Sequence, residues 1–579
     1  MFKKILAALS TVALVLVFTP SAQATADLVQ TDKLSRDNYI QSQSIQFVQV
    51  NTNLRLALWG ENSNSEITYM ASVVSADGHL GSTVQIGSSG TGMTFVPNLR
   101  FAVSSNHLLA VAYEHSTDNG NGYSSTINLV YSDDGIHWSA PVSALPPVDY
   151  QMCDPFMDFG CGYTAHGLLF DKLDHLELLA TFGQDFHRAS MVATSSSDGV
   201  VWANPTSLAI DQEGYNWSLF ENSSDPVSFV SSASGIFAAW YIYNPVDGSR
   251  QVWSARMPDP AHPFWLTAVN DYSTPGGSNL YYLHLQGTSN GSVVETFWET
   301  QNGQHTTLKS MTWSPTTKSW SAPATIHTVA SEWMSYLVYS EVKNNLSAFS
   351  WIEYSNGQDD LVKSLVFVDG VPGTVSTMRS GAGDGTGNDQ VFTTSVAADS
   401  TVSSAFYNYS LRKAYLLEQT PGGTTVTTEL PVDLSYNYAS RISEDAVGNL
   451  TVLAQWVPDS GQGNDLVVYQ KTRASAPIAN GPIVLRGTAK VGKTLTAQAP
   501  PFTSVSGVGA TTYKWFACTK QVKAFPSAIP KTCKVIKGAT KATLKLTKAQ
   551  KKTFVMFQAL NRNAVGLSTV FSTSTKAVG

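Results

Sequence analysis

The sequence is poor in charged residues, which make up 14% of its 579 positions against about 25% in an average soluble domain. Coiled coils, disordered acidic tails and proteins that coat nucleic acids are therefore poor fits. After the first two dozen residues, no apolar run approaches the roughly 20 residues that span a bilayer. Cysteine is scarce, with four residues, and the stretch from Pro477 to Gly579 has no acidic residue at all.

What is abundant points to short strands joined by turns. The chain has 42 Gly, 25 Pro and 11% aromatic residues, and the remainder is rich in Ser, Thr and Val. With 43% apolar residues, a chain of this length can bury a large core and is too long for one ordinary domain.

The first 24 residues have the pattern of a secretory signal peptide. Lys3 and Lys4 precede the apolar stretch Ile5–Val17, and Ala22-Gln23-Ala24 forms a small-residue cleavage site. We expect the mature chain to begin near Thr25 and to be exported, with an uncleaved anchor as the alternative. The protein is thus expected to be extracellular.

Export makes disulfides the favoured role for the four cysteines. Cys153 and Cys161 lie close together in the sequence, as do Cys518 and Cys533. Local pairing, 153 with 161 and 518 with 533, is the favoured one of three connectivities. A four-thiolate metal site is the rival, but zinc ligands prefer C-x-x-C spacing, which is absent.

Charge is segregated along the chain. Residues 25–476 contain 18 basic and 43 acidic residues, a net charge of −25, whereas residues 477–579 contain 16 basic residues and no acidic one. We place a domain boundary here, with one domain at 25–474 and a basic domain at 482–579.

The long first domain repeats itself. An Asn- or Gly-containing turn followed by an apolar strand recurs along this domain, and each copy ends on an aromatic: Trp59, Tyr113, Trp240, Trp298, Trp351 and Trp456. Two weaker copies end near Phe182 and Tyr407, and the eight aromatic anchors are 49 to 69 residues apart. The strands alternate with period two, so helices should be scarce. About four strands per unit predicts an all-β, seven- or eight-bladed β-propeller. Separate β-sandwiches are the alternative, but each unit is too short to bury its own core.

A local motif recurs within these units. Ser-x-Asp-Gly-x-x-Trp occurs twice, and Ser75–Gly78 and Trp320–Pro323 are degenerate copies; the two clear copies comprise Ser132, Asp134, Gly135 and Trp138, then Ser196, Asp198, Gly199 and Trp202. Asp accepts hydrogen bonds from turn amides and Gly takes a positive φ. The motif resembles the Asp-box of sialidase-like (BNR-repeat) propellers, with one residue fewer between Asp and Gly. This resemblance implies the propeller fold, with the boxes distant from the active site.

The resemblance does not extend to sialidase catalysis. That family clamps a substrate carboxylate with three arginines and uses a Tyr–Glu nucleophile pair and an Asp acid/base. Its F/Y-R-I-P motif is absent here, and ten arginines lie in residues 25–476. Arg100 and Arg441 precede first strands and are candidates for inward-pointing ligand contacts; arginines that merely stabilise blades are the alternative.

Two connections between repeats are candidates for a ligand-binding surface. The first contains Tyr150, Asp154 and Asp158 beside Cys153 and Cys161, and the second contains Glu213, Tyr215 and Trp217. Flat aromatic rings interleaved with hydrogen-bonding groups suit sugar recognition. An ordinary stapled surface loop is the alternative reading of the first connection.

Signals for a cofactor are weak. Asp384, Asn388 and Asp389 form a glycine-rich stretch with oxygen ligands suited to calcium, but a solvated turn explains them as well. We expect no cofactor and no other metal site.

The basic domain resembles bacterial Ig-like repeats. The resemblance rests on Gly487–Leu495, Tyr513-Lys514-Trp515, Ile536–Thr540 and Asn561–Gly566, and it implies a small sandwich with Trp515 in the core. Its uncompensated lysines suit an anionic cell-wall polymer or a membrane surface. The alternative is docking on the acidic propeller, and nucleic acid is not expected because no aromatics interleave with the lysines.

Together these features predict a secreted, cell-envelope-associated, monomeric protein that binds glycans or glycoconjugates. One alternative is a divergent sialidase-like exo-glycosidase that uses a Tyr/Glu or Asp/Glu pair from the connections. The other is a protein-interaction scaffold with no carbohydrate site.

Overall fold

The computed structural model describes residues 28–579 except for short gaps, and the chain divides into two compact units, Leu28–Lys471 and a second that contains Thr472–Gly579. The gaps are residues 37, 52–53, 64–65, 91–98, 119, 121–122, 151–161, 186–187, 211–226, 245–246, 302–303, 330–332, 341, 343–344, 355–359, 381–388, 398–399, 409–410, 412, 434–439, 445–448, 457–463, 473–475, 480, 505–507, 527 and 564–565. The expected signal peptide, 1–24, lies outside the described residues.

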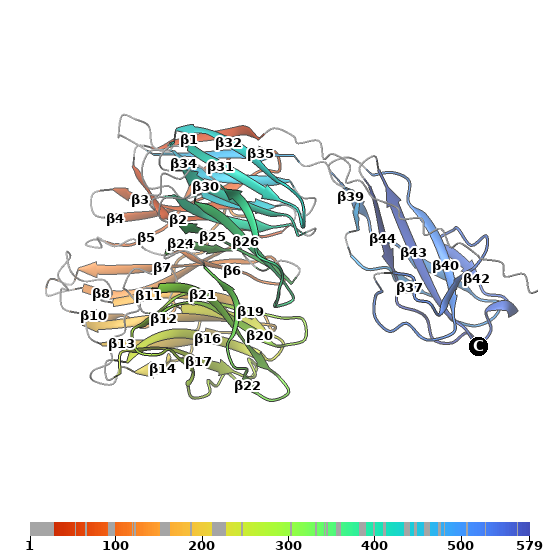
Figure 1. Ribbon diagram of the computed structural model, residues 1–579, viewed down its shortest axis with the longest axis horizontal. Helices are drawn as coiled ribbons and strands as arrows, with labels where there is room; N and C mark the ends of the chain where they lie inside the picture. Colours follow the sequence, from red (N-terminus) through yellow and green to blue (C-terminus); the bar gives the residue numbers. More distant parts are fainter. Residues whose placement is uncertain are drawn as a thin grey trace, which may run out of the picture. The chain divides into compact units, whose positions relative to one another are not determined.

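The described part of the first unit consists of eight antiparallel sheets of four or five strands (Figure 1). The first sheet holds β2 (Tyr39–Gln49), β3 (Arg55–Ser63), β4 (Glu66–Val74) and β5 (Val84–Ser88). The second holds β6 (Arg100–Val103), β7 (Leu109–Asp118), β8 (Tyr123–Ser132), β9 (Val142–Ser143) and β10 (Val148–Tyr150). The third holds β11 (Gly162–Phe170), β12 (Leu176–Asp185), β13 (Arg188–Ser196) and β14 (Thr206–Ile210). The fourth holds β15 (Val227–Ser232), β16 (Gly235–Asn244), β17 (Ser249–Met257) and β18 (Val269–Ser273).

The remaining four sheets follow the same plan. The fifth holds β19 (Ser278–Gly287), β20 (Val293–Gln301), β21 (Gln304–Ser314), β22 (Ser319–Trp320) and β23 (Ala324–Thr328). The sixth holds β24 (Trp333–Tyr339), β25 (Leu346–Tyr354), β26 (Leu361–Val368), β27 (Val371–Pro372) and β28 (Ser376–Ser380). The seventh holds β29 (Gln390–Val396), β30 (Val402–Asn408), β31 (Lys413–Gln419) and β32 (Thr425–Asp433). The eighth holds β33 (Ser440–Glu444), β34 (Leu450–Trp456), β35 (Asn464–Lys471) and, as its outer strand, β1 (Val29–Arg36).

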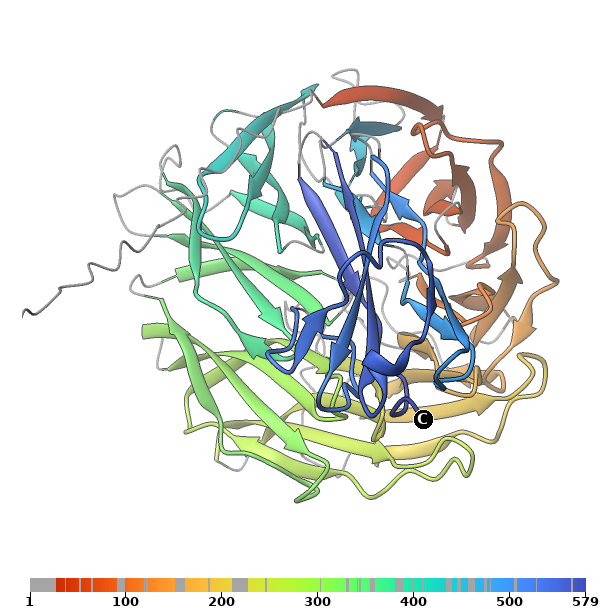
Figure 2. The same cartoon turned by 90° about the vertical axis from the view of Figure 1, so that its right-hand side faces the viewer.

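The sheets are arranged radially, as Figure 2 shows. Among first strands, β6 contacts β11, β11 contacts β15, β15 contacts β19, β24 contacts β29, and β29 contacts β33. The ring returns to its start where β2 of the first sheet contacts β33 of the eighth. Because the N-terminal strand β1 pairs with β35, the two ends of this unit close the same sheet. The closed radial array is consistent with the predicted propeller.

The core lies between the sheets rather than within them. We call each interface between two consecutive sheets a seam. Eight hydrophobic clusters are each shared by two consecutive sheets, and one of them joins the eighth sheet to the first. The second strand of each sheet, counted in chain order (β34 in the eighth), is buried on both faces. In β25, for example, every residue is buried. The predicted aromatic anchors all fall on second strands, where Trp59, Trp240, Trp298 and Trp351 are fully buried. A sheet stacked on both faces needs this near-continuous apolar pattern.

Two hairpin turns in the second and third sheets share one geometry. The amides of Ile136 and His137 donate to Asp134 Oδ1, and the Gly135 amide donates to Ser132 Oγ, all at 2.8 Å. Gly135 has a φ of +74°, and Gly199 repeats the conformation at +73°. Ser196 and Asp198 accept the equivalent amide bonds. Trp138 and Trp202 are half-buried against the seams with the preceding sheets.

The second unit is also all-β. Its strands are β36 (Ile478–Ala479), β37 (Val484–Arg486), β38 (Thr494–Gln498), β39 (Phe502–Thr503), β40 (Thr512–Cys518), β41 (Cys533–Val535), β42 (Thr543–Lys545), β43 (Phe554–Arg562) and β44 (Leu567–Phe571). The sheets β37-β38-β42 and β41-β40-β43-β44 share one core around Trp515, which is fully buried. A 3₁₀ turn, Lys548–Gln550, is the one helical element among the described residues. In the same part of the chain, no helix is long and apolar enough to cross a membrane.

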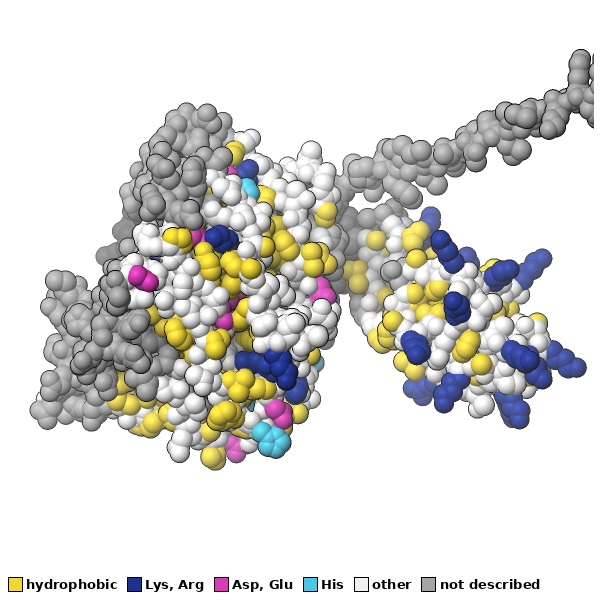
Figure 3. Space-filling view, turned by 60° about the horizontal axis from the view of Figure 1, so that its bottom comes forward, with side chains coloured by type: hydrophobic (Ala, Val, Ile, Leu, Met, Phe, Trp, Pro, Cys, Tyr) yellow, Lys and Arg dark blue, Asp and Glu magenta, His cyan; other side chains and the backbone are white. Residues whose placement is uncertain are grey.

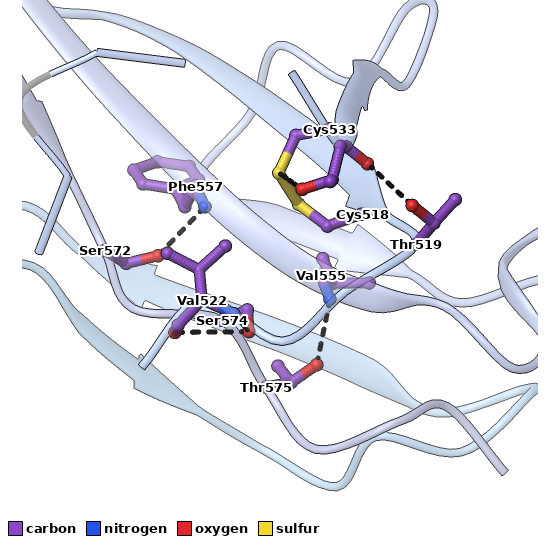
Figure 4. The surroundings of a disulfide bond; sticks show 10 residues. Cys518, Thr519, Val522, Cys533, Val555, Phe557, Ser572, Ser574 and Thr575 are labelled. Carbon is purple, nitrogen blue, oxygen red and sulfur yellow. Dashed lines mark hydrogen bonds between the residues drawn. A yellow bond between two sulfur atoms is a disulfide. The ribbon is translucent and has the colours of Figure 1, made fainter. Parts of the chain in front are cut away.

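The disulfide predicted between Cys518 and Cys533 is confirmed (Figure 4). It joins β40 to β41 at paired positions of the four-stranded sheet. Nearby, hydroxyls of the C-terminal segment close the sheet edge: the Val555 amide donates to Thr575 Oγ1 at 3.0 Å and the Phe557 amide donates to Ser572 Oγ at 2.9 Å. Cys153 and Cys161 lie outside the described residues, so their pairing stays a prediction.

Candidate functional site

Strand direction places the predicted ligand-binding connections at one end of the ring. In each sheet the first strand begins, and the last strand ends, at the same end because neighbouring strands are antiparallel. We call this the entry end. The connection 151–161 joins β10 to β11, and 211–226 joins β14 to β15, so both leave and re-enter the ring there. The two turns of Ser132–Trp138 and Ser196–Trp202 follow third strands and lie at the opposite end.

Most of the predicted contact residues lie outside the described residues. These are Asp154, Asp158, Glu213, Tyr215 and Trp217. Tyr150 ends β10 and pairs in register with Tyr123. The structure therefore locates the ends of these connections and leaves the contacts themselves as predictions.

Arg100 begins β6 at the entry end and lies in the seam between the second and third sheets. Its Nε–H donates to the Ala165 carbonyl oxygen at 3.2 Å, while the Ala165 amide donates to Glu114 Oε1 at the same distance. Burial raises the pKa of Glu114 to about 8, although the Ala165 amide and the positive charge of Arg100 oppose the shift. Arg100 thus helps to hold the seam between the second and third sheets, as a blade-stabilising arginine would.

The other candidates at inner strands lie on different sheets. Arg441 is half-buried on β33 and pairs in register with Leu453. Asp389 is buried just before β29, and the Asn408 side-chain amide donates to its Oδ2 at 2.9 Å. Its two partners in the predicted calcium loop, Asp384 and Asn388, lie outside the described residues. Among the residues that are described, no three His, Cys, Asp or Glu side chains are grouped to hold a metal.

A set of carboxylates near the ends of second strands escaped the sequence analysis. The Trp59 indole N–H donates to Glu61 Oε1 at 2.7 Å, and Arg36 of β1 pairs with the same carboxylate at 2.7 Å. The Trp351 indole N–H donates to Glu353 Oε1 at 2.9 Å, and His327 contacts that oxygen at 2.7 Å. The signal was a Trp-x-Glu pattern at two of the aromatic anchors. These carboxylates bind across seams and so stabilise the ring.

One described Tyr–Glu pair resembles the arrangement sought for a glycosidase. The Tyr272 phenol donates to Glu299 Oε2 at 2.6 Å, and Lys309 Nζ donates to Tyr272 Oη at 3.1 Å and also pairs with Glu299. Burial, followed by the hydrogen bond to Glu299, raises the pKa of Tyr272, so the phenol is not activated as a nucleophile. The pair joins the outer strand β18 of the fourth sheet to β20 and β21 of the fifth sheet. Its geometry is that of a structural bridge.

Comparisons with known proteins yield fold-level likenesses alone. No protein-family model and no curated protein sequence matches the chain. Among solved structures, the chain is similar to a PL25 ulvan lyase, with a TM-score of 0.41 and 11% identity over 70% of this chain and 95% of that one. It is also similar to the polysaccharide lyase Uly1 (TM-score 0.35, 11% identity, 78% and 98% coverage). A third is the GH93 α-L-arabinofuranosidase of Fusarium graminearum (TM-score 0.32, 12% identity, 65% and 92% coverage).

Proposed function

We propose that this protein is a secreted, cell-envelope-associated glycan-binding protein. Its first unit would be an eight-bladed, sialidase-like β-propeller with one sheet per blade. The turns at Asp134 and Asp198 would be Asp-boxes, and the second unit would be an Ig-like sandwich that retains the protein at the envelope.

The observation that carries the proposal is that the strands flanking two long connections end and begin at the same end of the ring. Residues 151–161 and 211–226 leave the second and third sheets, which are neighbours. Tyr150, Tyr215 and Trp217 provide flat apolar rings, and Asp154, Asp158 and Glu213 provide acceptors for hydroxyl groups. The first strand of each sheet begins at this end, and ligand sites of closed β-architectures occur at such mouths.

Binding is favoured over hydrolysis by what surrounds the described carboxylates. Glu61 binds Arg36 and Glu353 binds His327 across seams, and Glu299 binds Lys309 within its own sheet. A glycosidase needs two carboxyl groups facing a sugar, or a Tyr–Glu equivalent. In this proposal a catalytic pair would have to come from the connections themselves, which keeps the exo-glycosidase as the second candidate.

The second unit has the charge expected of an envelope-binding module. All 16 Lys and Arg side chains of residues 477–579 are exposed. On the face seen in Figure 3, its dark blue side chains are spread widely and no magenta carboxylate lies among them. Lys514 and Lys545 lie on different sheets of the sandwich. Attraction to a polyanion through such a distribution needs no single pocket.

The glycan proposal is tested with the mature chain, from Thr25, on a glycan array with released sugar assayed in the same wells. We expect binding without release, and loss of binding in Trp217→Ala and Tyr150→Ala. Trp202→Phe, at the opposite end, is the matched control. Release of a terminal sugar would replace the proposal with the exo-glycosidase, and neither binding nor release would favour the interaction scaffold.

The envelope proposal is tested by the salt dependence of binding to purified wall polymer or anionic vesicles. Binding should weaken steeply between about 0.05 and 0.5 M salt because exposed charges are screened. A chain truncated after Lys471 should not bind. Retention by the truncated chain would assign the attachment to the first unit instead.

A further inference from the structure

A pocket of about 430 Å³ opens between the fourth and fifth sheets, at the end of the ring opposite the entry end. Its walls come from β17 and β18 on one side and from β21, β22 and the turn between them on the other. The volume falls within the roughly 300–1,000 Å³ typical of small-ligand sites. None of the residues singled out from the sequence as ligand contacts lines it.

Two tryptophans form one wall of the pocket. Trp313 is buried and Trp320 is half-buried, and they face each other across the β21–β22 ladder, which places both rings on the same face of the sheet. The Trp320 indole N–H donates to Ser254 Oγ at 3.1 Å, which fixes its orientation. The facing wall carries Leu266 and Val269, whose side chains are 44% and 53% exposed. The pocket thus offers apolar surfaces suited to one face of a ring.

A guanidinium is held at this tryptophan wall. Arg256 Cζ lies 4.5 Å from the centroid of Trp313 and 5.7 Å from that of Phe237. Its Nε–H donates to the Ser234 carbonyl oxygen at 3.3 Å. Desolvation lowers the pKa of Arg256, and no described carboxylate pairs with it. A stacked guanidinium keeps its in-plane N–H groups available, and these fit a planar or tetrahedral anion.

The charge of the pocket is opposite to that of the unit around it. Lys318, exposed on the β21–β22 turn, adds a second cation. Among the described residues, Asp271 alone lines the pocket with a carboxyl group, and its buried Oδ2 has no hydrogen-bond partner there. Burial raises the pKa of Asp271 to about 7, and the neighbouring Glu295 is fully buried with its pKa raised as well. In mildly acidic solution the lining is therefore cationic, although residues 25–476 carry a net charge of −25.

We propose that this pocket is a second ligand site, which binds an anionic sugar unit. One face of the sugar ring packs on Trp320, its carboxylate or sulfate group binds Arg256 and Lys318, and a ring hydroxyl bonds to Asp271. A neutral sugar would leave the desolvated guanidinium of Arg256 without a partner, so the negative group is the main determinant of affinity. The inference does not depend on the connections at the entry end.

The test measures oligosaccharide binding to the full mature protein by isothermal titration calorimetry. The probes are tetragalacturonate, a sulfated galactose tetrasaccharide and neutral galactotetraose, which separate a carboxylate ligand from a sulfate ligand and both from an uncharged one. We expect at least one anionic probe to bind tenfold or more tightly than the neutral probe. Arg256→Gln and Trp320→Ala should each weaken that binding at least tenfold.

Two further variants keep the result interpretable if a buried substitution disturbs folding. Lys318→Asn removes an exposed charge at a positive φ of 55°, which Asn tolerates, and should weaken anionic binding about threefold or more. Trp217→Ala, in the entry-end connection, should leave it unchanged. Equal affinity for neutral and anionic probes, no binding of any probe, or loss of binding in Trp217→Ala but not in Lys318→Asn would each overturn the inference. The last outcome would support the entry-end site, so the two proposals fail separately.

Discussion

Two glycines of the second sheet have the same type of backbone conformation but different steric surroundings. A Cβ added to Gly135 would lie 2.5 Å from Leu56 Cδ2 in the first sheet, whereas one added to Gly120 would meet nothing within 4 Å. Both glycines have positive φ, 74° and 81°. Comparing Ala substitutions at these two glycines separates the free-energy cost of a left-handed backbone, which both pay, from the cost of the steric contact, which arises only at Gly135.

Gly120→Ala should destabilise the first unit by about 1–2 kcal/mol through the left-handed backbone alone. Gly135→Ala should add about 1–3 kcal/mol because the new methyl group overpacks the seam. Urea denaturation of both variants measures the difference. Equal losses would mean that the turn does not pack as tightly against Leu56 as the distances require.

Glu114 carries a proton whose loss should make stability depend on pH. The unfolded chain releases it near the ordinary pKa of 4.5, whereas the folded protein keeps it to about 8. Between these values the folded state binds more protons, so stability falls as pH rises. Glu114→Gln keeps an acceptor for the Ala165 amide and should reduce the loss of stability between pH 5 and pH 8. Denaturation midpoints at the two pH values test this, and an unchanged difference would contradict it.

At the scale of elements, the second strands pack on both faces, whereas the Asp134 and Asp198 turns follow third strands. The Trp-x-Glu segments at Trp59 and Trp351 combine both roles, because the indole fills one seam while its N–H orients the carboxylate two residues later. In the second unit, β40 has a comparable role, with Trp515 in the core and Cys518 tied to β41.

The double substitution Cys518→Ser, Cys533→Ser should lower the free energy of unfolding of the second unit by about 3 kcal/mol, the usual value for a loop of this length. The disulfide spans 15 residues. Thermal unfolding of the two units, followed with and without the bridge, should show the lower transition only in the second unit. A shift in both transitions would mean that the units do not unfold independently.

At the scale of the whole molecule, the first unit depends on contacts between its ends. β1 completes the eighth sheet, Lys33 pairs with Asp465 at 2.6 Å, and Arg36 reaches Glu61 of the first sheet. Glu61 is 1% exposed, so removing Arg36 leaves a buried carboxylate without its cation.

Deleting residues 28–36 should therefore destabilise the first unit by about 3 kcal/mol or more and broaden its thermal transition. Truncation after Lys471 is the matched control and should leave that transition in place, since it removes the other compact unit. An unchanged transition in the β1 deletion would show that the ring closes without its N-terminal strand.

The sequence predicted the repeat because the repeat is local. Six of the eight aromatic anchors, all except Phe182 and Tyr407, follow an Asn- or Gly-containing turn within a few residues, and all eight fall on second strands. The two long connections at the entry end were also predicted, because they lie between successive repeats of the sequence. Seam partners such as Arg100 and Ala165, 65 residues apart, were not, because nothing in a local pattern specifies which neighbouring backbone a long side chain will meet.

The sequence by itself determined the all-β class, the turn positions, the segregation of charge and the Cys518–Cys533 bridge, since all of these depend on short-range pattern and composition. The tertiary structure alone decided how β1 closes the eighth sheet and which charges pair across seams. It alone assembled Arg256, Asp271 and Trp320 around one pocket. These features depend on the register and stacking of separate sheets, and packing between sheets is a global property that no single repeat encodes.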